Sequence, residues 1–291
     1  MLMQLRLCGK LPSLKKYIMK LFKTFLLPTL ALVIFATSCK KDETTPLDPL
    51  SEYVYVSEAP ASALGFTVKV YAQEELFVGY NKILVKVTDN ATGAVLENPD
   101  IEFMPVMEMN SGMMHGCPLE QPTYNTSLKV MEGTITFVMP SMGLGKWMLG
   151  LKLKNAAGTE EEIKIEVDVV QKAEPQLFSF VSAADSNQSV FVALVNPKNP
   201  KIGINDFEVV VYERQTMMSW PALEQVKIEI EPEMPTMGHG SPNNVNPTEL
   251  GEGHYLGKVN FTMSGYWKVN MKLMTSTSEM MKGDAFFDIT F

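Results

Sequence analysis

The fold of this chain is decided by the stretch WKVNMKL at residues 267–273, in which apolar residues alternate strictly with polar ones. The same alternation occurs in VKIEIE (residues 226–231) and in IKIEV (residues 163–167). A period of two residues buries one face of a strand and leaves the other in water. Antiparallel sheets with one wet face are typical of β-sandwiches. We therefore predict an all-β chain.

The chain also repeats itself at an offset of 124 residues. A Gly-x-Asn motif at residues 79–81 recurs at 203–205, and HGCP at residues 115–118 recurs as HGSP at 239–242. Matches that keep their order along the chain favour duplication of one domain over chance.

A Gly-x-Trp motif completes each copy, at Trp147 and Trp267, where a large apolar side chain opens the last alternating strands. We predict two successive β-sandwich domains, at 52–171 and 177–291, joined near residues 171–175. Each holds about 115 residues, a normal size for one sandwich.

The first 38 residues have the character of a secretory signal peptide. They contain six basic residues and no acidic one, and a short apolar run at 25–36 precedes Cys39. The ending ATSC (residues 36–39) resembles the lipobox of bacterial lipoproteins, which implies that Cys39 carries the lipid. An ordinary cysteine after an ordinary signal peptide is the alternative. Met19 is a more natural start than Met1, so residues 1–18 are open to question.

The stretch at residues 39–51 is polar and contains proline, which suits a flexible tether to a lipid anchor. Lys41-Asp42-Glu43 is similar to a short signal that directs some lipoproteins to the outer face of the outer membrane. We therefore predict an outer-membrane lipoprotein that faces the periplasm or the cell surface. Without the signal, 25 − 6 = 19 basic residues remain against 33 acidic ones, a net charge of −14. Such a surface repels nucleic acid.

Methionine is unusually frequent and unevenly placed. The chain has 21 Met but three His and three Cys, and the 18 Met after the signal lie within 104–148 and 217–281. All three His and Cys117 lie in the same two blocks. The excess is therefore local and duplicated, which points to a function of these segments.

Gly, Pro and Asn mark residues 104–118 and 234–242 as loops. An exposed thioether has little structural purpose there and is prone to oxidation, but thioethers with an imidazole select Cu(I) over harder cations. His254 has no counterpart in the first copy, although strand pairing could bring it near its loop. Cys117 is replaced by Ser241, so it cannot be essential to a site common to both copies. The candidate metal ligands are Met107, Met109, Met113, Met114, His115, Cys117, Met234, Met237, His239 and His254.

Packing is the alternative role for these methionines. The loops would then plug one end of each sandwich, with the His side chains hydrogen-bonded to backbone. Met139, Met263 and Met271 share strand parity with buried aromatic residues, so we expect them in the cores. Four more have no pattern and are assigned to packing or surface: Met217, Met218, Met280 and Met281.

The second copy resembles the YtkA-like/FixH domain. Residues 228–240 carry a strand and a Met-Pro-x-Met-x-His loop, and residues 251–269 carry Gly-x-Tyr, an apolar strand and Gly-x-Trp. The first copy keeps the Gly, Met, His and Gly-x-Trp elements but has a rearranged loop and no Gly-x-Tyr. The resemblance implies immunoglobulin-like sandwiches in the cell envelope, in a family whose relatives are linked to copper handling and cytochrome oxidase assembly.

The sequence therefore predicts a lipoprotein that binds a soft metal, Cu(I), and delivers it to an envelope protein partner or sequesters it. A non-catalytic scaffold or partner-binding module without metal is the alternative. We predict no enzyme, because the sequence shows no nucleophile–base arrangement, no Gly-rich phosphate loop and no dense carboxylate–His cluster.

Overall fold

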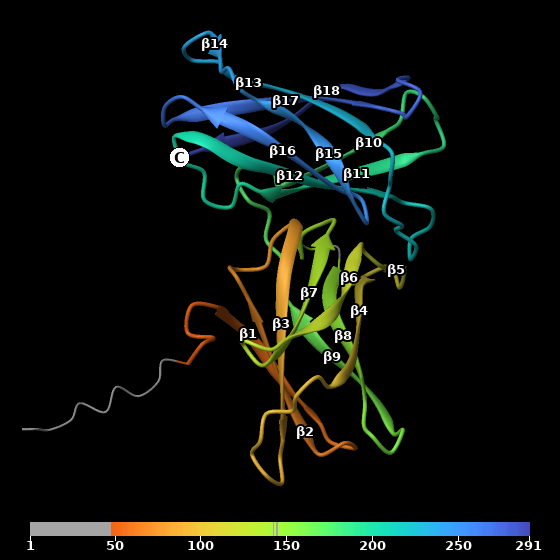
Figure 1. Cartoon of the computed structure of the whole chain (residues 1–291). Coiled ribbons are helices and arrows are strands. Elements are labelled where there is room, and N and C mark those ends of the chain that lie inside the picture. The colour runs from red at the N-terminus through yellow and green to blue at the C-terminus, as the bar shows by residue number, and fades with distance from the viewer. Residues whose placement is uncertain (1–47, 142, 144) are drawn as a thin grey trace, which may run out of the picture. The chain divides into compact units, whose positions relative to one another are not determined.

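The computed structural model describes residues 48–291 except 142 and 144, and the regular structure of this part of the chain consists of β-strands (Figure 1). The predicted all-β class is confirmed. The predicted signal peptide, the lipidation site Cys39 and most of the tether lie outside the described residues. Within the described ranges, no helix has the length and apolar character needed to cross a bilayer.

The first half of the chain forms two antiparallel sheets. One sheet has the order β1-β2-β3-β7-β6 and the other the order β5-β4-β8-β9. Their buried side chains form one common cluster, so the two sheets face each other across a single core. The strands are β1 (Val54–Ala61), β2 (Phe66–Ala72), β3 (Gly79–Asp89), β4 (Asp100–Met109), β5 (Met114–His115), β6 (Leu119–Asn125), β7 (Val130–Phe137), β8 (Gly145–Lys154) and β9 (Glu160–Val167).

The second half repeats this topology strand for strand. Its sheets have the orders β10-β11-β12-β16-β15 and β14-β13-β17-β18, which are the first two orders with nine added to every strand number. This identity is the structural form of the 124-residue repeat. The strands are β10 (Leu177–Val181), β11 (Ser189–Asn196), β12 (Gly203–Glu213), β13 (Lys227–Met234), β14 (His239–Gly240), β15 (Val245–Gly251), β16 (His254–Phe261), β17 (Tyr266–Met274) and β18 (Met280–Thr290).

A tryptophan lies at the centre of each core. Trp147 and Trp267 have no exposed surface, and each indole Nε1–H donates to a main-chain carbonyl, that of Met139 at 2.8 Å and that of Met263 at 3.0 Å. The bonds satisfy the one polar group of each ring, which would otherwise be costly to bury. The Gly-x-Trp motif therefore anchors both sandwiches.

The alternation at residues 267–273 places Trp267 and Leu273 in the core together with Met271, which is 2% exposed. The same reasoning is wrong for Met263, which is 40% exposed. Strand β16 ends at Phe261, so the parity that Met263 would share with Phe261 does not extend to it.

The repeated Gly-x-Asn motif fixes the entry to the long central strand of each sandwich. The Asn81 amide accepts from the Phe77 N–H at 3.0 Å and donates to the carbonyls of Phe77 and Gly79, both at 2.7 Å. In the second copy, Asn205 makes the same three contacts with Lys201 and Gly203. The motif therefore closes the same turn in both copies.

Replacing Asn205 by alanine is expected to lower the free energy of unfolding by about 1–2 kcal/mol, because the N–H and carbonyl of Lys201 lose their protein partners. Denaturant unfolding would measure the loss. Asn199, which is exposed in the same connection, provides the control. An Asn205→Ala variant no less stable than Asn199→Ala would contradict the role given to the motif.

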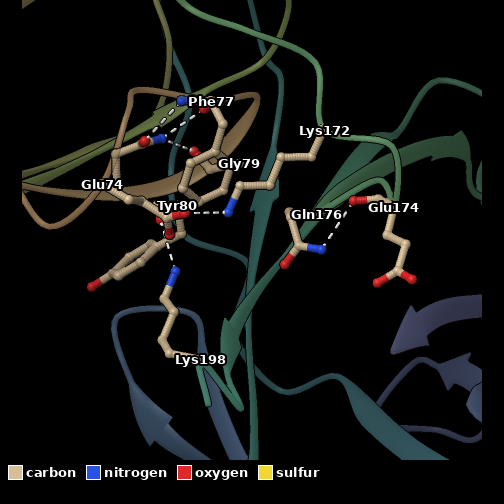
Figure 2. Close-up of polar contacts among 9 residues, drawn as sticks. Glu74, Phe77, Gly79, Tyr80, Lys172, Glu174, Gln176 and Lys198 are labelled. Carbon is tan, nitrogen blue, oxygen red and sulfur yellow. Dashed lines mark hydrogen bonds and ion pairs between the residues drawn. The ribbon is translucent and has the colours of Figure 1, made fainter. Parts of the chain in front are cut away.

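The connection between β9 and β10 packs against the turn that precedes β3, within one compact unit that extends from Pro49 to Phe291. The Lys172 Nζ lies 2.6 Å from a Glu74 carboxylate oxygen (Figure 2), and the same ammonium lies 3.5 Å from the centre of the Phe77 ring. Lys198, after β11, donates to the Tyr80 carbonyl at 3.3 Å. The Phe77 ring is buried and therefore held in place, so the cation–π contact with Lys172 has a well-defined geometry.

Candidate functional site

Each sandwich places a methionine opposite a histidine at the end of one sheet. In the first, Met107 on β4 is the register partner of His115 on β5, and in the second, Met234 on β13 pairs with His239 on β14. Register partners in antiparallel strands lie on the same face, with Cβ atoms about 5 Å apart. Because the two loops differ in length and sequence, the equivalence of Met107 and Met234 is visible in the structure but not in the sequence.

The segment predicted as a loop at residues 104–118 is in large part strand. β4 pairs with β8 without interruption from Asp100 to Met109, where Met109 lies opposite Gly145. Glycine is required at 145, because a Cβ there would lie 2.6 Å from the Glu108 carbonyl oxygen. The predicted loop is therefore restricted to the few residues that connect β4 with β5.

Three of the predicted ligands lie in the cores. Met107 has no exposed surface, Met234 is 3% exposed and Cys117 is 5% exposed. Burial raises the pKa of the Cys117 thiol well above its usual range, so the thiolate form that binds metal is disfavoured. Met109 is half-buried and packs against the first core. In the folded state these side chains act in packing.

The other loop residues are accessible. Met113 is 52%, Met114 46% and Met237 61% exposed. His115 is half-exposed and its ring makes no hydrogen bond to any residue in the described part of the chain. His239 lies 2.9 Å through Nδ1 from its neighbouring Gly240 carbonyl. A carbonyl can only accept, so Nδ1 carries the proton and the Nε2 lone pair remains available to a ligand.

His254 has a different role from the one predicted. Its Nδ1 lies 2.9 Å from Glu208 on β12, and its Nε2 lies 2.8 Å from Glu120 on β6. Burial by itself would lower the pKa of His254, but the two carboxylates outweigh it and raise the pKa to about 9. Hydrogen bonding from His254 in turn lowers the pKa of Glu208. At neutral pH both ring nitrogens carry protons, so neither can bind a metal, and His254 leaves the candidate ligand set.

The Gly-x-Tyr motif, of which His254 is the middle residue, is structural. Tyr255 has no exposed surface, and its hydroxyl accepts from the Val226 N–H at 3.0 Å and donates to the Leu223 carbonyl at 2.9 Å. Gly253 has a φ of +76°, and a Cβ there would lie 2.5 Å from the Val211 carbonyl oxygen. These contacts tie β16 to the connection that leads into β13.

Two methionines that the sequence assigned to packing or surface belong to the accessible set. Met217 and Met218 follow β12 and are 42% and 58% exposed. The Met217 carbonyl accepts from the Gly116 N–H at 2.8 Å, which brings them beside the loop of the first copy. In the sequence, the one indication that these two residues belong to the site was their position in the second methionine block. Among residues 48–141, 143 and 145–291, no three His, Cys, Asp or Glu side chains gather as a metal-binding group.

The comparisons with solved structures give distant similarities. The chain is 11% identical to the Yersinia pseudotuberculosis adhesin InvE, covering 81% of this chain and 58% of that one with a TM-score of 0.24. It is 10% identical to a DUF4785 family protein from Legionella pneumophila, covering 78% of this chain and 57% of that one with a TM-score of 0.26. It is 8% identical to a conserved domain protein from Bacillus anthracis, covering 80% of this chain and 88% of that one with a TM-score of 0.26. At these scores the similarities carry no functional inference.

The chain spans less than two thirds of the length of the Yersinia and Legionella proteins. No curated protein matches the sequence. A family match is found in the second half of the chain, over strands that include the loop with His239 and the two buried anchors Tyr255 and Trp267. This confirms the resemblance predicted for the second copy: residues 185–272 match the YtkA-like family model.

Proposed function

We propose that this protein is a non-catalytic lipoprotein of the cell envelope that binds Cu(I) through the Met and His side chains of its β4–β5 and β13–β14 turns. It delivers the ion to an envelope protein partner or sequesters it. Cys39 would carry the lipid and attach the chain to the outer membrane, with residues 39–51 as the tether.

The proposal is supported above all by the pairing of accessible thioethers with an available imidazole in both repeats. Met113 and Met114 precede His115, and Met237 precedes His239, and each of these methionines exposes at least 46% of its surface. Exposed methionine costs apolar hydration without packing in return. Uncharged thioethers with imidazole are ligands that favour Cu(I), and unlike thiols they do not form disulfides in an oxidising compartment.

The test is a titration of the purified mature chain with Cu(I) in the presence of a chromogenic Cu(I) chelator. We expect the wild-type protein to remove Cu(I) from the chelator. Replacing Met113, Met114 and Met237 by leucine, which is close in volume, should weaken uptake at least tenfold. Met280, which is 43% exposed and outside both turns, gives the control variant Met280→Leu.

Two results would overturn the proposal. One is a wild-type chain that leaves the chelator complex intact, and the other is a triple leucine variant that binds Cu(I) as tightly as Met280→Leu. Either would favour the scaffold alternative, in which the exposed methionines are an adaptable contact surface for a protein partner.

A further inference from the structure

Two methionine-rich segments that lie about a hundred residues apart in the sequence meet in the structure. The Gly116 N–H, directly after β5, donates to the Met217 carbonyl at 2.8 Å. A Cβ on Gly116 would lie 3.4 Å from the Met218 Cα and 3.6 Å from the Met218 Cε. The thiomethyl end of Met218 therefore lies beside residue 116, which follows His115 in the chain.

This meeting is specific to the first repeat. Gly240 is the counterpart of Gly116, and the contact that a Cβ there would make within 4 Å is with the Pro232 carbonyl of its own sandwich. The contact between Gly116 and residues 217–218 therefore has no counterpart at Gly240, and the second turn itself carries one exposed methionine, Met237, and His239. The first loop carries Met113, Met114 and His115, and Met217 and Met218 contact Gly116, the residue that follows them.

The turn that carries the two added methionines is held in place by its own hydrogen bonds. The Trp220 indole N–H donates to the Met217 carbonyl at 3.3 Å, and the Met218 N–H donates to the Thr216 hydroxyl at 3.2 Å. The Met217 carbonyl therefore accepts both from this turn and from Gly116. A turn fixed on both sides presents its side chains at low entropic cost, which favours binding.

We infer that Met217 and Met218 complete the Cu(I) site of the first repeat, so that one ion is bound between the β4–β5 turn and residues 217–218. The inference rests on the proposed function and deepens it by naming the ligand set. Four exposed thioethers and one imidazole, whose ring makes no hydrogen bond within the described residues, form a set of neutral donors that suits Cu(I). The first site should therefore bind Cu(I) more tightly than the second, whose turn itself carries one exposed methionine, Met237, and one histidine.

The test compares three variants of the full mature chain by Cu(I) competition and by copper X-ray absorption, which counts sulfur ligands. They are Met217→Leu/Met218→Leu, Met113→Leu/Met114→Leu and the control Met280→Leu. We expect both double variants to lose the tighter site, with at least a tenfold loss of affinity and fewer sulfur ligands. The control should match wild type.

The outcomes separate the two proposals. If Met113→Leu/Met114→Leu weakens binding while Met217→Leu/Met218→Leu leaves affinity and sulfur count unchanged, the shared site is overturned and the proposed function stands. If wild type takes up no Cu(I), the proposed function is overturned and the inference with it.

A second measurement uses wild type alone and does not depend on the folding of variants. Cu(I) is diamagnetic, so the methyl resonances of ¹³C-labelled methionine can be followed during an anaerobic titration. Those of Met217 and Met218 should shift together with those of Met113 and Met114 at the first equivalent. Shifts confined to Met113 and Met114 would contradict the inference.

Discussion

Replacing Trp267 by alanine should lower the free energy of unfolding by about 3–5 kcal/mol, the range for removing a large aromatic side chain from a core. Trp267 has no exposed surface, and its ring lies 5.4 Å from the Phe261 ring and 5.9 Å from the His239 ring. The variant would also leave the Met263 carbonyl without its indole donor. A domain is typically stable by about 5–15 kcal/mol, so this loss would leave the second sandwich marginal.

Denaturant unfolding measures the effect, and Phe286→Ala is the matched control. Phe286 is also an aromatic residue of the same sheet, on β18, but it is 42% exposed and its ring contacts the Lys268 ammonium at 4.2 Å. We expect the control to lose about 1 kcal/mol or less. Similar losses in the two variants would show that Trp267 is not the anchor of this core. Because His239 lies against the ring, the Trp267 variant should also weaken Cu(I) binding at the second loop.

The second large effect is expected at His254. Replacement by leucine removes the cation between Glu120 and Glu208, whose side chains are 29% and 17% exposed. Removing one partner of a fully buried ion pair costs about 3–5 kcal/mol. We expect about 2–3 kcal/mol here, because water still reaches both carboxylates. Glu208 would keep the Asn196 amide as a donor at 2.7 Å, while the charge on Glu120 would lose its cation.

Lys258→Leu provides the control on the same two strands. Lys258 on β16 pairs with Asp206 on β12, and the two side chains are 45% and 54% exposed. An exposed pair of this kind contributes about 0–1 kcal/mol. The interpretation also requires that Glu120→Gln and Glu208→Gln, introduced together with His254→Leu, recover part of the loss. No recovery would mean that the leucine acts through packing and not through charge.

The same group makes stability depend on pH in a defined direction. The pKa of His254 is about 9 in the folded state, above the value of about 6.5 expected in an unfolded chain. Its contribution is therefore fully present below about pH 6.5 and is lost as the pH rises through 9. The difference in stability between wild type and His254→Leu should shrink between about pH 6 and pH 9.5. A difference that stays constant over this range would contradict the charged state assigned to the ring.

The sequence predicted the architecture well because period-two alternation is a local signal. Residues 267–273 fill the core of the second sandwich as expected, and the 124-residue offset corresponds to two halves with the same strand order. The same local signal could not place the end of a strand. β4 continues to Met109 because it pairs with β8 along its whole length. Met107, a predicted ligand, lies within this paired strand and is buried in the core.

The candidate site was predicted less completely because it depends on contacts between distant residues. Glu120 and Glu208 are 134 and 46 residues from His254, and neither belongs to a motif. Met217 and Met218 likewise have no pattern of their own in the sequence, and the hydrogen bond from Gly116 gives them a place beside the first loop. Residue type identified which side chains suit a soft metal, and the fold determined which of them water can reach.

The buried thiol of Cys117 can report how often the first sandwich opens locally. Cysteine reagents attack the accessible thiolate, whereas this group is 5% exposed and its pKa is raised. Labelling must therefore wait for a local opening of the strands around residue 117, and its rate measures how often they open. The second repeat has Ser241 at the corresponding position, and Cys117 is the one free cysteine between residues 48 and 291 as described. Because serine replaces cysteine in the second repeat, the rate of thiol labelling reports local opening of the first sandwich alone.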